Sequence, residues 1–222
     1  MTMPSVIADY QKKVISAQLK KFVSTINQAI DLAKAENGDY EYWNVAQKSN
    51  TKNSQIFRDY LVPKLKINLS ACENIDFDSH YANTRTTSFY FKAKKENCIG
   101  VLNDSAIIFD IADIYEENFI YTAFMVDVNG IKPPNRGAKD MFAFAVWLKA
   151  DCDDRSCDMV VGQYHGITKG ETGLIISGKY PPIMNGTRYN HCLKAALPSY
   201  CGIVLRDNSW QFPVSHSKDY IT

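Results

Sequence analysis

Six cysteines are the residues of this 222-residue chain whose type and spacing point most directly to chemistry. Their even number and local grouping are typical of disulfide bonds formed in an oxidising compartment. Many pairings are open to six cysteines, and the sequence alone does not choose among them. Proximity along the chain favours one expected set of pairs: Cys72–Cys98, Cys152–Cys157 and Cys192–Cys201.

Two other states of the cysteines remain as alternatives. They could be reduced structural thiols, or they could bind zinc. Structural zinc sites usually contain a Cys-x-x-Cys pair, and none is present. The only close His–Cys neighbours are His191 and Cys192. Disulfide bonds are therefore the expectation.

A second candidate for chemistry is the polar segment between Asp127 and Asp140, which holds two glycines, two prolines and several oxygen-bearing side chains. Hard oxygen ligands of this kind suit Ca²⁺. The candidate ligands are Asp127, Asn129, Asn135 and Asp140. The segment lacks the closing Glu of an EF-hand loop. The alternative is a structural loop whose Asp and Asn side chains bond its own backbone amides. Apart from Ca²⁺, no cofactor is expected.

Catalytic motifs are absent from the sequence. His165 could pair with a cysteine in nucleophilic catalysis, but no Gly-x-Ser-x-Gly turn, phosphate-binding glycine loop or His-Glu-x-x-His motif occurs. The basic pairs Lys12-Lys13 and Lys94-Lys95 are too short for a nucleic-acid interface. We expect a protein that is not an enzyme and does not bind nucleic acid.

One long helix is expected to organise the chain. Apolar residues between Pro4 and Asn37 recur at steps of three and four, which indicates one face of an amphipathic helix. Asn37-Gly38 is a typical C-terminal stop, because glycine adopts the left-handed conformation without a Cβ penalty. At about 1.5 Å per residue the helix would reach roughly 50 Å, so its N-terminal half should protrude from an ordinary domain.

After the helix, residues 38–85 form a connector with a short helix around Ile56–Leu65, and residues 86–222 form a strand-rich region. Strands are predicted on either side of an Asn103-Asp104 turn, and the alternation of apolar and polar residues predicts more strands beyond it. The further candidates are Phe119–Val128, Met141–Leu148, Met159–Gln163, Leu174–Ser177, Gly202–Arg206 and Trp210–Phe212. This order predicts an α+β fold with the helix of residues 1–37 packed on an antiparallel sheet.

Composition limits the classes of protein to which the chain can belong. A chain that is 45% hydrophobic and 12% aromatic can bury a core. The formal net charge of +1 creates no general attraction to nucleic acid or anionic membrane. No run of about 20 apolar residues occurs. Because the chain opens directly on an amphipathic helix, we expect it to be a fragment of something longer.

Three segments resemble type IV pilins and pseudopilins. The opening Pro4-Ser-Val-Ile-Ala-Asp-Tyr10-Gln-Lys-Lys is similar to the middle of their N-terminal helix. Asp127-Val-Asn-Gly followed by Pro-Asn135 and Lys-Asp140 looks like a recurring segment of one branch of bacterial pilin-like proteins. The stretch from Cys192 to Trp210 resembles their disulfide-closed C-terminal region, with Asn208-Ser209 where glycine is common. The connector and residues 152–186 match no part of the family.

The resemblance implies a structural subunit of a type IV pilus-like or type II secretion-like filament. An apolar half-helix just upstream of Met1 would anchor the chain in the inner membrane, facing the periplasm, before assembly into a surface filament. The partners would be copies of the chain, other pilins and the inner-membrane assembly machinery. The expected assembly face is Ile7, Tyr10, Val14 and Ile15, while Phe22 to Ala33 would pack on the chain's own sheet. An extracellular ligand-binding or adhesin domain on a helical stalk is the alternative, and a secreted hydrolase using His165 is a third hypothesis.

Overall fold

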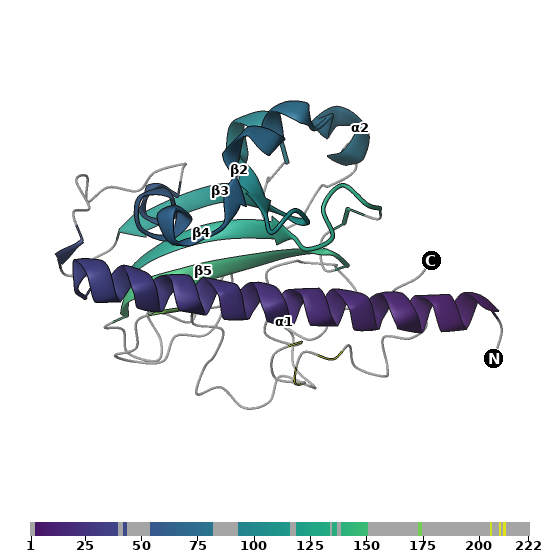
Figure 1. Cartoon of the computed structure of the whole chain (residues 1–222), viewed down its shortest axis with the longest axis horizontal. Coiled ribbons are helices and arrows are strands. Elements are labelled where there is room, and N and C mark those ends of the chain that lie inside the picture. Colours follow the sequence, from purple (N-terminus) through teal and green to yellow (C-terminus); the bar gives the residue numbers. More distant parts are fainter. Residues whose placement is uncertain are drawn as a thin grey trace.

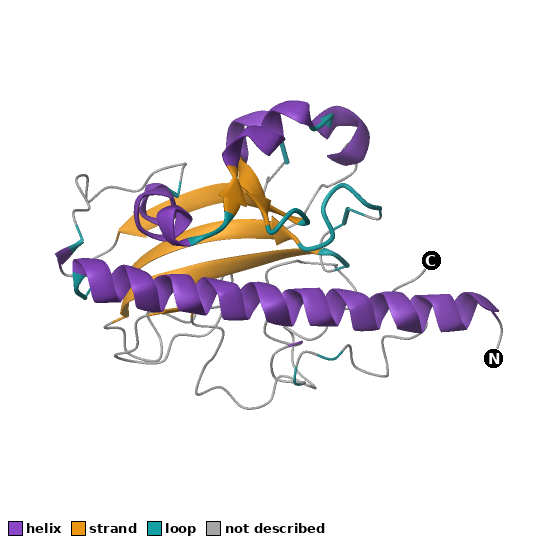
Figure 2. Ribbon diagram, viewed as in Figure 1, coloured by secondary structure: helices purple, strands orange, loops and turns teal. Residues whose placement is uncertain are grey.

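A computed structural model describes residues 3–39, 42–43, 54–81, 93–115, 119–133, 135–136, 139–150 and 173–174, together with residues 205, 209 and 211. Within these residues, one long helix lies across an antiparallel sheet (Figure 1), and shorter helices sit beside the sheet (Figure 2). The predicted α+β arrangement is confirmed.

Helix α1 spans Met3–Asn37, 35 residues, close to the predicted Pro4–Asn37. It ends where the sequence predicts, because Gly38 adopts a φ of +77° and its N–H donates to the carbonyl oxygen of Lys34 at 2.8 Å. That left-handed cap satisfies a carbonyl in the last turn of the helix. The N-terminal part of α1 extends beyond the ends of the strands (Figure 1).

Within the residues that the structure describes, the sheet has six strands, and each pairs antiparallel with the next along the chain. The strands are β1 Ile67–Asn68, β2 Cys98–Leu102, β3 Ala106–Tyr115, β4 Phe119–Asp127, β5 Met141–Ala150 and β6 Gly173–Leu174. The predicted turn is present between β2 and β3, where Asn103 and Asp104 both have positive φ and the Ser105 N–H donates to the Leu102 carbonyl oxygen at 3.2 Å, as in a type I′ turn. Three residues lie between the paired Leu102 and Ala106.

Other strand predictions have mixed outcomes. Strands β4 and β5 match the predicted Phe119–Val128 and Met141–Leu148, and β6 overlaps the predicted Leu174–Ser177 only at Leu174. Met159–Gln163 lies outside the described residues. Of Gly202–Arg206 and Trp210–Phe212, the structure describes only Leu205 and Gln211.

The connector contains more helical turns than the sequence predicts. A π-helix at Phe57–Leu61 and a 3-10 helix at Val62–Lys64 follow each other at the predicted short helix, and the helical run ends one residue after Pro63. Two further helices, the 3-10 helix Leu69–Asn74 and α2 Phe77–Tyr81, were not predicted. A third short 3-10 turn, Lys95–Asn97, leads into β2.

The larger core cluster joins α1 and the connector to one face of the sheet. Phe22 of α1 packs against the rings of Phe124 and Phe144, with centroids 6.1 and 5.6 Å apart. Alternate residues of each strand share a face, which is why Phe124 and Val126 belong to this cluster while Met125 does not. The helix residues in the cluster are Leu19, Phe22, Ile26, Ala29, Ile30 and Ala33, which confirms the predicted contact with the sheet.

A smaller cluster covers the other face. Ile107, Phe109 and Met125 pack there against Phe77 and Tyr81 of α2. The sheet in the described residues therefore carries apolar side chains on both faces.

Candidate functional site

The first apolar segment of α1 is exposed. The side chains of Ile7 and Tyr10 are 58% and 68% exposed, and Val14 is 36% exposed. Ile15, the fourth residue of the predicted assembly face, differs from them because it packs against the larger core cluster. The four predicted residues thus divide between two directions of the helix.

Helix geometry explains this division. At about 100° per residue, Ile7, Tyr10 and Val14 project in one direction, roughly 120° around the axis from the core residues Leu19 to Ala33. Ile15 projects with the core residues. We call Ile7, Tyr10 and Val14 the second apolar face of α1. It is the largest group of exposed apolar side chains on α1 that the structure describes.

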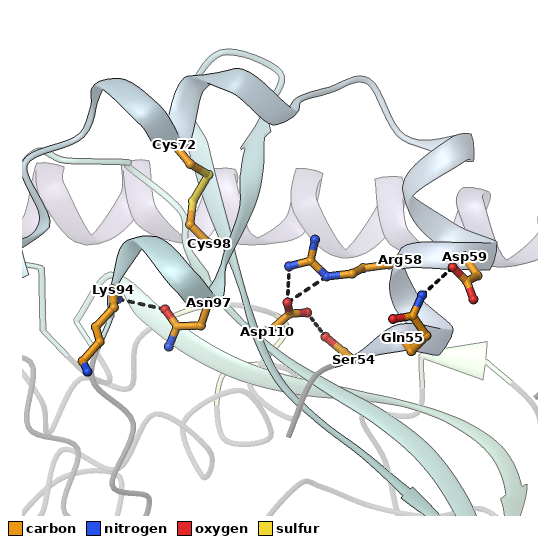
Figure 3. A network of polar contacts seen from close by, with 9 residues as sticks. All are labelled: Ser54, Gln55, Arg58, Asp59, Cys72, Lys94, Asn97, Cys98 and Asp110. Carbon is orange, nitrogen blue, oxygen red and sulfur yellow. Dashed lines mark hydrogen bonds and ion pairs between the residues drawn. A yellow bond between two sulfur atoms is a disulfide. The ribbon is translucent and has the colours of Figure 1, made fainter. Parts of the chain in front are cut away.

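The Cys72–Cys98 disulfide predicted from chain proximity is present and closes a separation of 26 residues (Figure 3). It ties the 3-10 helix of residues 69–74 to the start of β2, beside the smaller core cluster. Constraining the unfolded chain by a link of this length stabilises the fold by about 3–4 kcal/mol in the chain-entropy model. Cys152, Cys157, Cys192 and Cys201 lie outside the described residues.

The predicted ligand loop forms, and all four predicted residues lie in it. Asp127 accepts hydrogen bonds from the Tyr81 hydroxyl at 2.9 Å and from the Asn129 amide at 3.2 Å. Asp140 accepts from the backbone amides of Asn135 at 2.8 Å and Arg136 at 2.7 Å. These bonds correspond to the alternative that the sequence left open, a loop closed by its own backbone amides.

The loop also holds α2 in place. Its Asn135 side chain donates to the carbonyl oxygens of His80, at 3.0 Å, and Ile131, at 3.2 Å. Gly130, with a φ of +70°, lies so close to the β2–β3 turn that an added Cβ would come within 2.5 Å of the Ser105 carbonyl oxygen. Only glycine fits this contact.

Burial gives the two loop carboxyls unusual electrostatics. Asp127 and Asp140 are fully buried, and desolvation raises the pKa of Asp140 to about 6. Desolvation, and next the neighbouring charge of Asp140, raise the pKa of Asp127 well above its ordinary value. The side-chain oxygens of Asn129 and Asn135 are buried and receive no hydrogen bond in the described part of the chain. In that part no group of three His, Cys, Asp or Glu side chains could hold a metal ion. The Ca²⁺ site stays a prediction.

A second buried carboxyl pair lies where the connector crosses β3. Asp110 forms an ion pair with Arg58 and a hydrogen bond with the Ser54 hydroxyl (Figure 3). The backbone amide of Ile56 donates to Asp113 at 2.9 Å. A bulge between Asp110 and Ala112 lets residues three apart face the same side of the sheet.

Asp110 and Asp113 differ in how burial of their carboxyl groups is balanced. Asp110 has Arg58 as its counter-charge, whereas desolvation raises the pKa of Asp113 to about 6. Sequence reasoning missed this site, although two Asp residues in an otherwise apolar strand were a usable signal. Through these bonds the two buried acids hold the connector against β3 and support the fold.

His165 lies outside the described residues, so the hypothesis of a hydrolase that uses it stays a hypothesis. Of the four histidines the structure describes only His80, which is half-buried on α2. The described helices include none long and apolar enough to cross a membrane.

A family model matches residues 5–220, which is nearly the whole chain. The chain belongs to that family, the "Family of unknown function (DUF6613)". No curated protein matches the chain, and no solved structure does. The description of the family assigns no activity.

Proposed function

We propose that this protein is a structural subunit of a type IV pilus-like or type II secretion-like filament, without catalytic activity, which assembles through α1. The observation that carries the proposal is the second apolar face. Ile7, Tyr10 and Val14 are exposed on a helix whose other apolar face is already covered by the sheet. Such a group of exposed apolar side chains marks an interaction surface.

The arrangement of α1 supports the same function. Because one end of a 35-residue helix is packed on the sheet, the protruding end is held as a rigid rod that can reach a neighbouring copy. Burial of apolar surface there would favour association by about 25 cal/mol per Å². Tyr10 and Ile7 would supply most of that area.

The proposed function also implies a location and partners for the chain. The chain would face the periplasm from the inner membrane before assembly, anchored by an apolar segment upstream, and would then enter a surface filament. Its partners would be copies of itself, other pilins and the inner-membrane assembly machinery. The Cys72–Cys98 disulfide is compatible with such an oxidising environment.

The test is filament formation by the gene product expressed at its encoded length in its own host. We expect electron microscopy to show filaments for the natural sequence and none for the Ile7→Asp/Val14→Asp pair, because two charges would have to be buried. A matched control, Ser24→Asp/Asn27→Asp, adds the same charge at exposed polar positions of α1 and should leave filaments intact. Absence of filaments from the natural sequence, or filaments unaffected by the first pair, would overturn the proposal.

A further inference from the structure

The loop between β4 and β5 brings two buried carboxyl groups together beside α2. Asp127 ends β4 and Asp140 directly precedes β5, and the Val128 N–H donates to the Asp140 carbonyl oxygen at 3.0 Å. Both aspartates are fully buried, and the charge of Asp140 acts on Asp127. Two acids therefore lie next to each other in a place from which water is excluded.

No ion pair balances these acids in the described part of the chain. The basic residues of the loop are Lys132, Arg136 and Lys139, and none of them forms an ion pair with either carboxyl there. Burial lowers the pKa of Lys139 even though Asp140 acts in the opposite direction. The other titratable groups on the neighbouring elements are Asp78, His80 and Tyr81 of α2 and Asp104 of the β2–β3 turn. A buried carboxyl beside a second one, without a counter-charge, tends to retain its proton.

The loop is also short of hydrogen-bond donors. The side-chain oxygens of Asn129 and Asn135 are buried and accept no hydrogen bond from the described residues. Buried acceptors are normally paired. A protonated carboxyl is a donor as well as an acceptor, whereas an ionised carboxyl only accepts. One retained proton therefore supplies a donor that the loop lacks.

The surroundings of the two carboxyls assign the proton to Asp127. Each oxygen of Asp140 accepts a backbone N–H, from Asn135 at 2.8 Å and from Arg136 at 2.7 Å, which favours its ionised form. Oδ2 of Asp127 instead meets the Tyr81 hydroxyl at 2.9 Å. That hydroxyl can donate to a carboxylate or turn and accept from a neutral acid. Burial and then the charge of Asp140 raise the pKa of Asp127.

We propose that Asp127 keeps its proton at neutral pH while Asp140 is ionised, and that this proton holds the loop closed on α2. The loop grips α2 at two points, the Tyr81 hydroxyl and the His80 carbonyl oxygen, which accepts from the Asn135 side chain. Loss of the proton leaves two like charges side by side, and opening of the loop to water relieves them. The closed loop is thus a switch that opens as the pH rises.

The part that opens is defined by its neighbours. The Cys72–Cys98 disulfide holds the 3-10 helix of residues 69–74, so the movable segment is residues 75–81. Its departure uncovers Phe109 and Met125 on the sheet face opposite α1. The switch therefore exposes an apolar surface when the proton is released. It does not depend on the proposed filament.

Two amide substitutions test the position of the proton. Folding of the natural chain at neutral pH requires Asp127 to take up a proton, whereas the amide of Asp127→Asn is neutral already and keeps the same shape. We expect Asp127→Asn to raise the melting temperature at about pH 7.5 by about 5 °C or more. Asp140→Asn is the matched control, and it should gain less because one backbone N–H loses its acceptor. EDTA in every sample keeps cations off the carboxyls.

The outcomes that would overturn the assignment are specific. An unchanged or lower melting temperature for Asp127→Asn would mean that its carboxyl is ionised in the folded chain. An equal or larger gain for Asp140→Asn would place the proton on Asp140 instead.

Hydrogen exchange as a function of pH tests the opening. The amides of His80 and Val128 are hydrogen-bonded in the closed form and report on α2 and on the loop. After correction for intrinsic exchange, their protection should fall by up to tenfold per pH unit from pH 6 to pH 8, the slope for release of one proton. It should not fall in Asp127→Asn. Protection that is independent of pH in the natural chain, or equal to that of residues 22–33 at every pH, would exclude a local switch.

Discussion

The two halves of α1 are built from similar residues but meet different surroundings. In the C-terminal half, Leu19, Ile26 and Ala33 are fully buried against the sheet and the connector. In the N-terminal half, Ile7 and Tyr10 stand exposed. Apolar residues recur through both halves, but those of the N-terminal half project about 120° around the axis from those of the C-terminal half, and only the C-terminal set faces the sheet. The difference suggests that one half stabilises the fold and the other is available for association.

Truncating a buried side chain of α1 should give the largest difference in stability between the two halves of the helix. Phe22→Ala removes a ring packed on Phe124 and Phe144, and we expect a loss of about 3–5 kcal/mol in the free energy of unfolding. Tyr10→Ala in the exposed half should cost less than about 0.5 kcal/mol. Urea denaturation of both variants measures the difference. Equal losses would mean that the two halves do not differ.

The dependence of stability on pH reports on the packed part of the molecule, because the carboxyls with raised pKa values lie there. Asp113 and Asp140 keep their protons up to about pH 6 when folded, against 3.8 when unfolded. The folded state therefore holds more protons between these values, so the contribution of these two carboxyls to stability should be greatest below about pH 4, fall as the pH rises towards 6, and change little above that. The loss is at most about 3 kcal/mol for each carboxyl.

Thermal melts from pH 4 to pH 7 measure this loss. Asp113→Asn should flatten the dependence, since the amide does not titrate. Stability that increases with pH over the same range would contradict the account of these carboxyls.

Backbone substitutions give the smallest expected effects. Gly38→Ala forces a Cβ into a conformation with a φ of +77°, at the end of the packed half, and should cost about 1–2 kcal/mol. Gln11→Gly, in the exposed half, should change the free energy of global unfolding by less than about 0.5 kcal/mol, because that half can fray separately. Denaturation curves distinguish the two, and a larger loss for Gln11→Gly would show that the exposed half is part of the cooperative unit.

The sequence predicted those features of the fold that depend on local rules. The stop at Gly38, the Asn103-Asp104 hairpin and the strands β4 and β5 each follow from backbone conformation or from residue type along a short stretch. The Cys72–Cys98 pair also followed from proximity along the chain. None of these needs knowledge of distant contacts.

Features that depend on tertiary contacts were missed or incomplete. The bulge that turns Asp110 and Asp113 to one side of β3 depends on how the connector crosses the sheet. Ile15 was predicted to share a face with Ile7 and Val14, although about 100° per residue groups it with the core residues of α1, and the contact with the core cluster decides its direction. For the loop from Asp127 to Asp140, the sequence offered a cation site and a self-bonded loop, and only coordinates show the amide bonds to the carboxyls.

The most direct measurement of the central idea is hydrogen exchange along α1 in the isolated chain and in the assembled state. In the isolated chain we expect the amides of residues 7–14 to exchange faster than those of residues 22–33, because Ile7, Tyr10 and Val14 are exposed whereas Phe22, Ile26 and Ala33 are buried. Assembly should slow residues 7–14 selectively, as the second apolar face becomes covered. Exchange at residues 7–14 that does not change on assembly would contradict the account.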